Sequence, residues 1–92
     1  MVDYEVEHHR DGVNVYHFQV PHDERRQGRG TAAMRRIIEE ARADGLDYVV
    51  VNMGGGDAAE SFLRGLGFEI VEREPGGHVT AELELSSDFD FS

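Results

Sequence analysis

The sequence predicts a mixed α/β fold whose elements follow one another as β-β-α-β-α-β-β. Two segments with helical periodicity each stand between segments with strand character, which is typical of a sheet containing a parallel strand pair. Hairpin signals near both ends of the chain indicate that the other strands are antiparallel. The 92 residues suit one domain, which we place at residues 1–85 and expect to be followed by an acidic, loosely held tail at 86–92.

Two strands are expected before the first helix. Apolar and polar side chains alternate over residues 3–9, which suits a half-buried strand, and Arg10-Asp11-Gly12 predicts a turn into a second strand at 13–20. The apolar phase of this second strand shifts by one residue between Val15 and Tyr16. Such a shift indicates either a bulge or burial on both faces of the strand.

Amphipathic patterns predict both helices. The first covers about residues 28–43, with apolar side chains at i, i+3, i+4 and i+7, and Gly45 is expected to end it. A continuous apolar run at 46–51 then predicts a central strand covered on both faces. Asp57, with Glu60 three residues later, resembles a capping box at the start of the second helix.

The last part of the chain predicts an antiparallel hairpin. Gly67 is expected to end the second helix, and a strand follows from Phe68. Pro75-Gly76-Gly77 predicts a turn into a final strand with one wet face. Its inward-pointing side chains are expected to be Val79, Ala81, Leu83 and Leu85.

The charge of the chain excludes several classes of partner. The formal net charge is -10, with 19 acidic residues against 9 basic ones, all of which are Arg. This field repels phosphate, so nucleic acid and anionic membranes are not expected as general partners. A Lys-free, acidic composition is typical of halophilic proteins, whose self-repulsion is screened by concentrated salt. The alternative interpretation is an ordinary acidic cytosolic protein.

Other classes are excluded by what the sequence lacks. Cysteine is absent, so no disulfide, thiolate catalysis or zinc-thiolate site is expected. No metal site is expected at His8 and His9 either, because adjacent strand residues point to opposite faces. We see no signal peptide and no membrane-spanning run, and we expect a cytoplasmic protein.

The strongest chemical signal lies between the second strand and the first helix. A helix N-terminus offers unpaired N–H groups and the positive end of the macrodipole, so it can hold an anion. Gly28 and Gly30 let phosphate oxygens approach the main chain, while Arg25, Arg26 and Arg29 gather positive charge in an acidic chain. A phosphorylated ligand is therefore expected. The alternative is that the glycines merely shape a tight loop.

This loop matches neither the nucleotide P-loop GxxxxGK[ST] nor the dinucleotide motif GxGxxG. It resembles the acetyl-CoA loop of the GNAT superfamily of N-acetyltransferases, (Q/R)xxGx(G/A), with Arg25, Gly28 and Gly30 at the defined positions. A second segment at residues 58–68, AAESFLRGLGF, is similar to the family's AAxxFYxxLGF. The resemblance covers about residues 13–85.

The resemblance implies a splay between the two parallel strands that holds acetyl-CoA, the co-substrate. Backbone amides over residues 26–31 would bind its pyrophosphate, and a bulge near Tyr16 would open the splay for its pantetheine arm. It implies an N-acetyltransferase that transfers the acetyl group to an unidentified primary amine by direct attack. The implied cofactor-binding residues are Phe18, Val20, Arg25, Arg26, Gln27, Gly28, Arg29, Gly30 and Thr31.

Two departures from the family pattern bear on catalysis. Leu63 stands where many members have a Tyr general acid, and Gly56 stands where an Asn is common. Only about two strands precede the loop, so a homodimer is one way to complete the acceptor pocket. Three functions stay open: an acetyltransferase, a non-catalytic CoA-binding module, and an interaction domain that has lost the ligand.

His17 is the leading candidate for the general base, because an imidazole exchanges its proton near neutral pH. Glu5 and Glu7 on the neighbouring strand are the alternatives. The competing interpretation of His17 is a partly exposed strand residue without a catalytic role.

Overall fold

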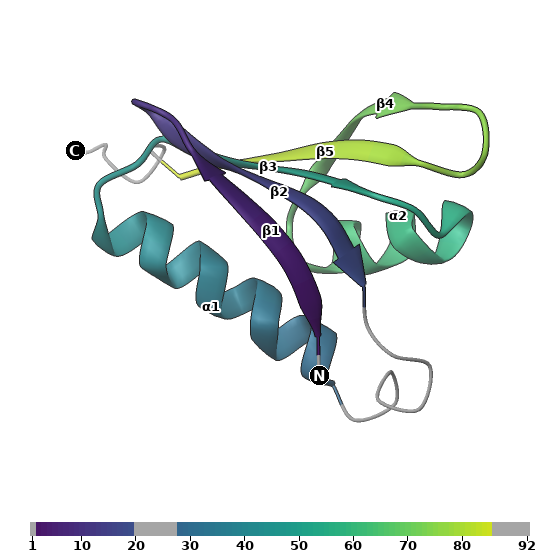
Figure 1. Ribbon diagram of the computed structural model, residues 1–92, viewed down its shortest axis with the longest axis horizontal. Coiled ribbons are helices and arrows are strands. Elements are labelled where there is room, and N and C mark those ends of the chain that lie inside the picture. Colours follow the sequence, from purple (N-terminus) through teal and green to yellow (C-terminus); the bar gives the residue numbers. More distant parts are fainter. Residues whose placement is uncertain (1, 20–27, 86–92) are drawn as a thin grey trace.

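The computed structural model describes residues 2–19 and 28–85, whose strands form one five-stranded mixed sheet (Figure 1). The elements follow the expected order, which is confirmed: β1 (Asp3–His8), β2 (Gly12–Gln19), α1 (Arg29–Ala43), β3 (Tyr48–Met53), α2 (Gly56–Gly65), β4 (Glu69–Arg73) and β5 (Val79–Glu84). The tail predicted at 86–92 lies outside the described residues.

The sheet contains one parallel strand pair at its centre. The strand order is β1-β2-β3-β5-β4, and β2 runs parallel to β3, from Gly12 opposite Tyr48 to Tyr16 opposite Asn52. The other three neighbouring pairs are antiparallel. Helix α1 makes the crossover that a parallel pair requires, so the predicted central parallel pair is confirmed.

Both helices cover the same face of the sheet. The register sets Val15 opposite Val51 and Val51 opposite Ala81, so these side chains share a face and line up across three strands. In Figure 1 both helices lie below the strands. The buried core on this side combines Val13, Val15, Phe18, Val49, Val51, Val79, Ala81 and Leu85 with Met34, Ile37, Ile38 and Ala41 of α1 and Ala59, Leu63 and Phe68.

The opposite face carries no helix among the described residues, and we call it the helix-free face. For this reason the expectation that the central strand is covered on both faces was wrong. Val49 and Val51 are buried under the helices, whereas Tyr48 and Val50 are only half-buried on the helix-free face.

Strand β1 was expected to be half-buried, but all six of its residues are exposed. It is an edge strand that pairs with β2 alone, and α1 packs mainly on β2 and β3. Tyr4 and Val6 therefore stay 40% and 38% exposed. The Tyr4 ring does stack on that of Phe18, with a centroid distance of 5.8 Å.

The phase shift in β2 is a bulge, the first of the two alternatives. Asp3 pairs with Gln19 and Glu5 with Tyr16, so two steps on β1 correspond to three on β2. The extra residue lies at His17, whose φ of 55° is the one positive value among the described non-glycine residues. Parallel pairing with β3 stops at Tyr16, so the two central strands separate beyond the bulge.

Glycines mark the C-terminal end of α1 and the N-terminal end of α2. Gly45 follows α1 with φ 75°, and the Leu46 N–H donates to the Ala41 carbonyl at 3.0 Å, which confirms the predicted helix end. The capping box at Asp57 was wrong. Helix α2 begins earlier, after Gly55, because a φ of 125° at this N-cap turns the chain where other residues would be strained.

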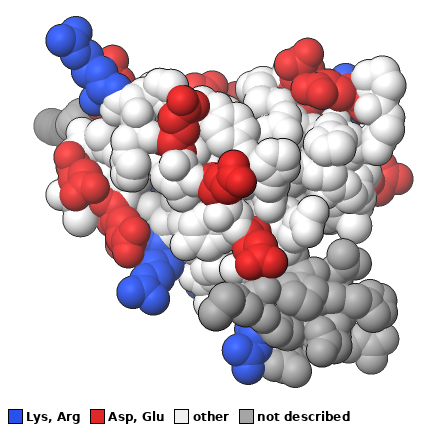
Figure 2. Space-filling view, viewed as in Figure 1, with Lys and Arg blue, Asp and Glu red and all other residues white. Residues whose placement is uncertain are grey.

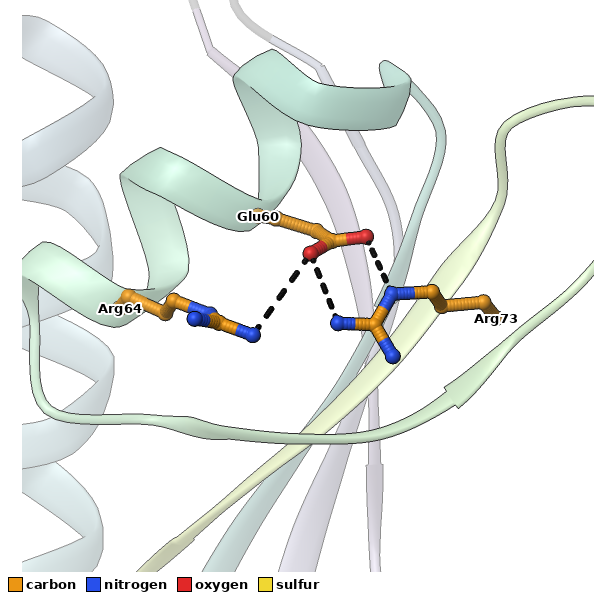
Figure 3. A network of polar contacts seen from close by, with 3 residues as sticks. All are labelled: Glu60, Arg64 and Arg73. Carbon is orange, nitrogen blue, oxygen red and sulfur yellow. Dashed lines mark hydrogen bonds and ion pairs between the residues drawn. The ribbon is translucent and has the colours of Figure 1, made fainter.

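Glu60, the other half of that expected box, instead ties α2 to the edge strand β4 (Figure 3). Arg73 donates from Nε to Oε2 at 2.7 Å and from Nη2 to Oε1 at 3.1 Å, and Arg64 Nη2 lies 3.8 Å from Oε1. The hydrogen bond from Arg73 lowers the pKa of the Glu60 carboxyl.

Candidate functional site

A cavity of about 560 Å³ opens at the end of the sheet where β2 and β3 separate. Its volume is within the range of small-molecule sites, which is roughly 300–1,000 Å³. Four parts of the chain contribute to it: the bulge of β2, the start of α1, the end of β3 with the start of α2, and the turn before β5. The lining residues are His17, Phe18, Gln19, Gly28, Gly30, Thr31, Asn52, Met53, Gly54, Gly55, Ala58, Ala59, Phe62 and His78.

Aromatic rings give the cavity an apolar wall. Phe18 is buried, and its ring stacks on that of Phe62 with a centroid distance of 5.8 Å. The bulge positions this wall, because the extra residue returns Phe18 to the helix-covered face after Val15. This part of the cavity suits an apolar or thioether chain of a ligand.

Two helix N-termini face the same cavity. The N-cap of α1 is Gly28 with φ 71°, and the N-cap of α2 is Gly55 with φ 125°. A glycine has no side chain to cap the N–H groups of the first turn, and these groups stand at the positive end of the helix dipole. The arrangement thus offers two places for negatively charged groups of a ligand.

Polar side chains gather on the β3 and β5 side of the cavity. Asn52 donates from Nδ2 to Thr80 Oγ1 at 2.9 Å, which fixes its amide. The His78 ring lies over the backbone of Gly54, where an added Cβ would stand 3.5 Å from Nε2. With His17 on the bulge, the described lining holds two imidazole side chains.

The structure brings together five of the residues predicted for the site: His17, Phe18, Gly28, Gly30 and Thr31. Arg29 is exposed in the first turn of α1 and is not a lining residue of the cavity. Four further predicted ligand-binding residues lie outside the described residues: Val20, Arg25, Arg26 and Gln27.

The alternative bases, Glu5 and Glu7, lie on β1 outside the cavity lining. Glu7 Oε1 accepts a hydrogen bond of 3.0 Å from the Tyr16 hydroxyl. Leu63, where a Tyr general acid is common, is fully buried in the core and also lies outside the lining.

Sequence reasoning missed Asn52, Met53 and His78. Asn52 carried a usable signal, because a polar residue at the carboxyl end of a buried parallel strand often faces a ligand. His78 carried none. It reaches the cavity because β5 lies beside β3 in the sheet, a neighbour relationship between strands far apart in the chain.

Within residues 2–19 and 28–85, no group of three or more His, Asp or Glu side chains is arranged to hold a metal ion. Neither helix in this part of the chain is long and apolar enough to cross a membrane.

Solved acetyltransferase structures share this fold. The chain aligns with Ard1 from Thermoplasma volcanium at a TM-score of 0.75 and 21% identity, covering 91% of this chain and 61% of that one. The ribosomal-protein-S18-alanine N-acetyltransferase from Escherichia coli aligns at a TM-score of 0.75 and 20% identity, covering 96% of this chain and 65% of that one. A GNAT family acetyltransferase from Elizabethkingia anophelis, solved with acetyl-CoA bound, aligns at a TM-score of 0.71 and 17% identity. The alignment covers 91% of this chain and 68% of that one.

The first two of these proteins are longer, and the chain spans 61% and 65% of their lengths. No curated protein matches the chain. Residues 2–68 match the model of the Acetyltransferase (GNAT) family, and the chain belongs to this family.

Proposed function

We propose that this chain binds acetyl-CoA in the cavity between β2 and β3 and transfers the acetyl group to a primary amine. The observation that carries the proposal is the convergence of two glycine-capped helix N-termini and a strand splay on one cavity. Membership of the GNAT family supports it, as does the neighbour from Elizabethkingia anophelis with acetyl-CoA bound.

The phosphates would bind at the start of α1. The N–H groups of Gly30 and Thr31 belong to the first turn of the helix, and their residues line the cavity. The neighbouring residues Arg25 and Arg26 would add positive charge to a site that is otherwise set in an acidic chain.

The pantetheine arm would bind along β2 beyond the bulge. Parallel pairing with β3 stops at Tyr16, so the main chain of Phe18 and Gln19 is open on the β3 side and can pair with an extended ligand. The amide groups of pantetheine would take the place of an added strand.

In the reaction, the amine nitrogen attacks the thioester carbonyl carbon. A C–N bond forms, the C–S bond breaks, and the sulfur leaves as a thiolate that takes a proton from water. The ammonium proton of the attacking nitrogen goes to His17, which lines the cavity on the bulge.

A non-catalytic CoA-binding module is the second candidate function. The burial of Leu63 favours it, because the position that commonly supplies a general acid is here part of the apolar core. Both candidates require acetyl-CoA binding, and turnover separates them.

The test is a titration of isotope-labelled protein with acetyl-CoA, followed through backbone amide NMR shifts. We expect the largest shifts at Phe18, at residues 28–31 and at the start of α2. Folded protein whose amides stay unmoved at saturating acetyl-CoA would overturn the proposal. Binding without turnover across a panel of primary amines would leave the CoA-binding module as the function.

A further inference from the structure

The helix-free face carries acidic residues from three different strands. On β1 these are Asp3, Glu5 and Glu7, on β4 Glu69 and Glu72, and on β5 Glu82 and Glu84. The register aligns them in rows: Glu7, Asn14, Val50, Glu82 and Glu69 form one row, and Glu5, Tyr16, Asn52, Thr80 and Glu72 form the next. Each of these carboxylate residues is exposed.

The arginines of the described residues lie away from this face. The described arginines lie on the helices, in the turn after β1, or at Arg73, whose guanidinium reaches α2 on the other side of the sheet. None of them therefore occupies a strand position on the helix-free face. On the side of the molecule seen in Figure 2, acidic side chains also outnumber arginines.

Two of these carboxylates are placed where they destabilise the sheet. Glu69 stands directly opposite Glu82 in the β4–β5 ladder. Like charges at directly opposed positions destabilise a strand pair. An external positive charge would relieve this repulsion.

The centre of the face has a different chemistry from its rim. Tyr16, Tyr48 and Val50 are half-buried there, and the Tyr48 ring packs over Gly12, where a Cβ would collide with it. Tyrosine rings offer apolar area with a polar tip and are enriched at protein interfaces. An apolar and aromatic centre with a charged rim is the composition of a protein-binding surface.

We propose that the helix-free face docks a basic segment of a partner protein, with Lys or Arg side chains against the acidic strands and apolar side chains over Tyr16, Tyr48 and Val50. A second copy of this chain is a poor occupant, because it would bring two sets of the same carboxylates together. Nucleic acid and anionic membranes are excluded by the sign of the charge.

The size of the face indicates a weak complex. Five strands spaced about 4.8 Å apart and six residues long span roughly 19 by 20 Å, or about 400 Å². Stable complexes bury about 800 Å² on each partner. The charges would therefore speed association and set specificity, and the complex would weaken with added salt.

A helical peptide of Ala, Leu and Lys is the probe for this proposal, with a Glu-for-Lys peptide as its control. Both are titrated into labelled protein at the lowest ionic strength that preserves the folded amide spectrum. Shifts are expected on β1, β4 and β5. The triple variant E72Q/E82Q/E84Q is expected to weaken binding about tenfold. The matched variant E39Q/E40Q/D44N removes the same number of negative charges, two from α1 and one just after it. It is expected to change the affinity for the Lys peptide less than about twofold.

Equal weakening by both triple variants would show a general charge effect and overturn the proposal. Shifts gathered on α1, binding of the Glu peptide, or the absence of binding would overturn it too, as would self-association through these strands. The proposal does not depend on acetyl-CoA, and a parallel titration with acetyl-CoA tests the cavity separately.

Discussion

Gly28 and Gly45 hold nearly the same left-handed backbone at opposite ends of α1, with φ 71° and φ 75°, and in the described part of the chain neither has an atom within 4 Å of an added Cβ. The two positions therefore carry the same strain when substituted, yet Gly28 alone lines the cavity. This pair separates the conformational role of a glycine from its role in binding.

Gly28→Ala and Gly45→Ala should each lower the free energy of unfolding by about 1 kcal/mol, measured by thermal or denaturant unfolding. Acetyl-CoA binding should weaken in Gly28→Ala alone, because its methyl group stands where phosphate oxygens approach. Calorimetric titration measures this difference. Equal affinity in the two variants would contradict the assignment of the anion site to the start of α1.

His17 tests whether the bulge has a chemical role. A glycine adopts φ 55° without strain, so His17→Gly should leave the free energy of unfolding within about 1 kcal/mol of the parent. Acetyl transfer should fall by about 10²-fold with acetyl-CoA affinity retained, because the proton acceptor is lost. Initial rates against acetyl-CoA concentration measure both quantities, and an unchanged kcat would remove His17 from the mechanism.

The Glu60–Arg73 pair predicts a pH dependence of stability. The hydrogen bond from Arg73 lowers the pKa of Glu60, so the pair contributes stability above the ordinary pKa of a glutamate. This contribution is lost as the pH falls through the lowered pKa. Glu60→Gln should therefore lower the melting temperature at pH 7, and the difference from the parent should shrink in acid.

Glu40→Gln is the control for this series. Glu40 accepts a single, longer hydrogen bond of 3.4 Å from Arg36 on the exposed surface of α1. Its substitution should have a smaller effect at pH 7. A Glu60→Gln deficit that stayed constant from pH 7 into acid would show that lost packing, rather than the ion pair, causes it.

The opposed glutamates predict a stabilising substitution. Glu82→Gln removes the charge that faces Glu69 and should raise the free energy of unfolding by about 0.2–1 kcal/mol at low salt. Glu84→Gln, on the same strand and face, stands opposite Tyr48 and should have a smaller effect. Urea unfolding of both variants measures this, and an equal gain in the two would point to net charge instead of the pair.

A net charge of -10 predicts that added salt stabilises the fold. The Debye length falls from about 10 Å at 0.1 M to about 3 Å at 1 M, so repulsion between surface carboxylates is screened. The melting temperature should rise between these concentrations with NaCl and with KCl alike. A melting temperature that is independent of salt would argue against the halophilic interpretation.

The order of the elements followed from local patterns in the sequence. The stripe of Met34, Ile37, Ile38 and Ala41 predicted α1, and Gly45 predicted its end. The shift of apolar phase after Val15 indicated that β2 has either a bulge or two buried faces. These features were predictable because helix and strand periodicities, and the backbone freedom of glycine, are properties of residues close together in the chain.

Relations between distant segments required the folded chain. The N-cap of α2 is Gly55 in the structure, whereas the sequence predicted Asp57. Glu60 pairs with Arg73, which lies on the strand that follows the helix. The exposure of β1 followed from where α1 packs. Period-2 alternation could predict which residues share a face within one strand, although not which strand lies beside it.

In the candidate site, too, some features were predictable from local sequence and others required the folded chain. Gly28, Gly30 and the bulge near His17 were visible in the sequence, because a phosphate loop and a phase shift are local motifs. Asn52 lies beside the bulge because β3 pairs with β2, and His78 reaches the cavity because β5 lies between β3 and β4, with its start beside the end of β3. The same sheet order sets Glu69 opposite Glu82. Strand pairing joins residues far apart in sequence, and the free energy that selects it comes from packing of the whole sheet against both helices.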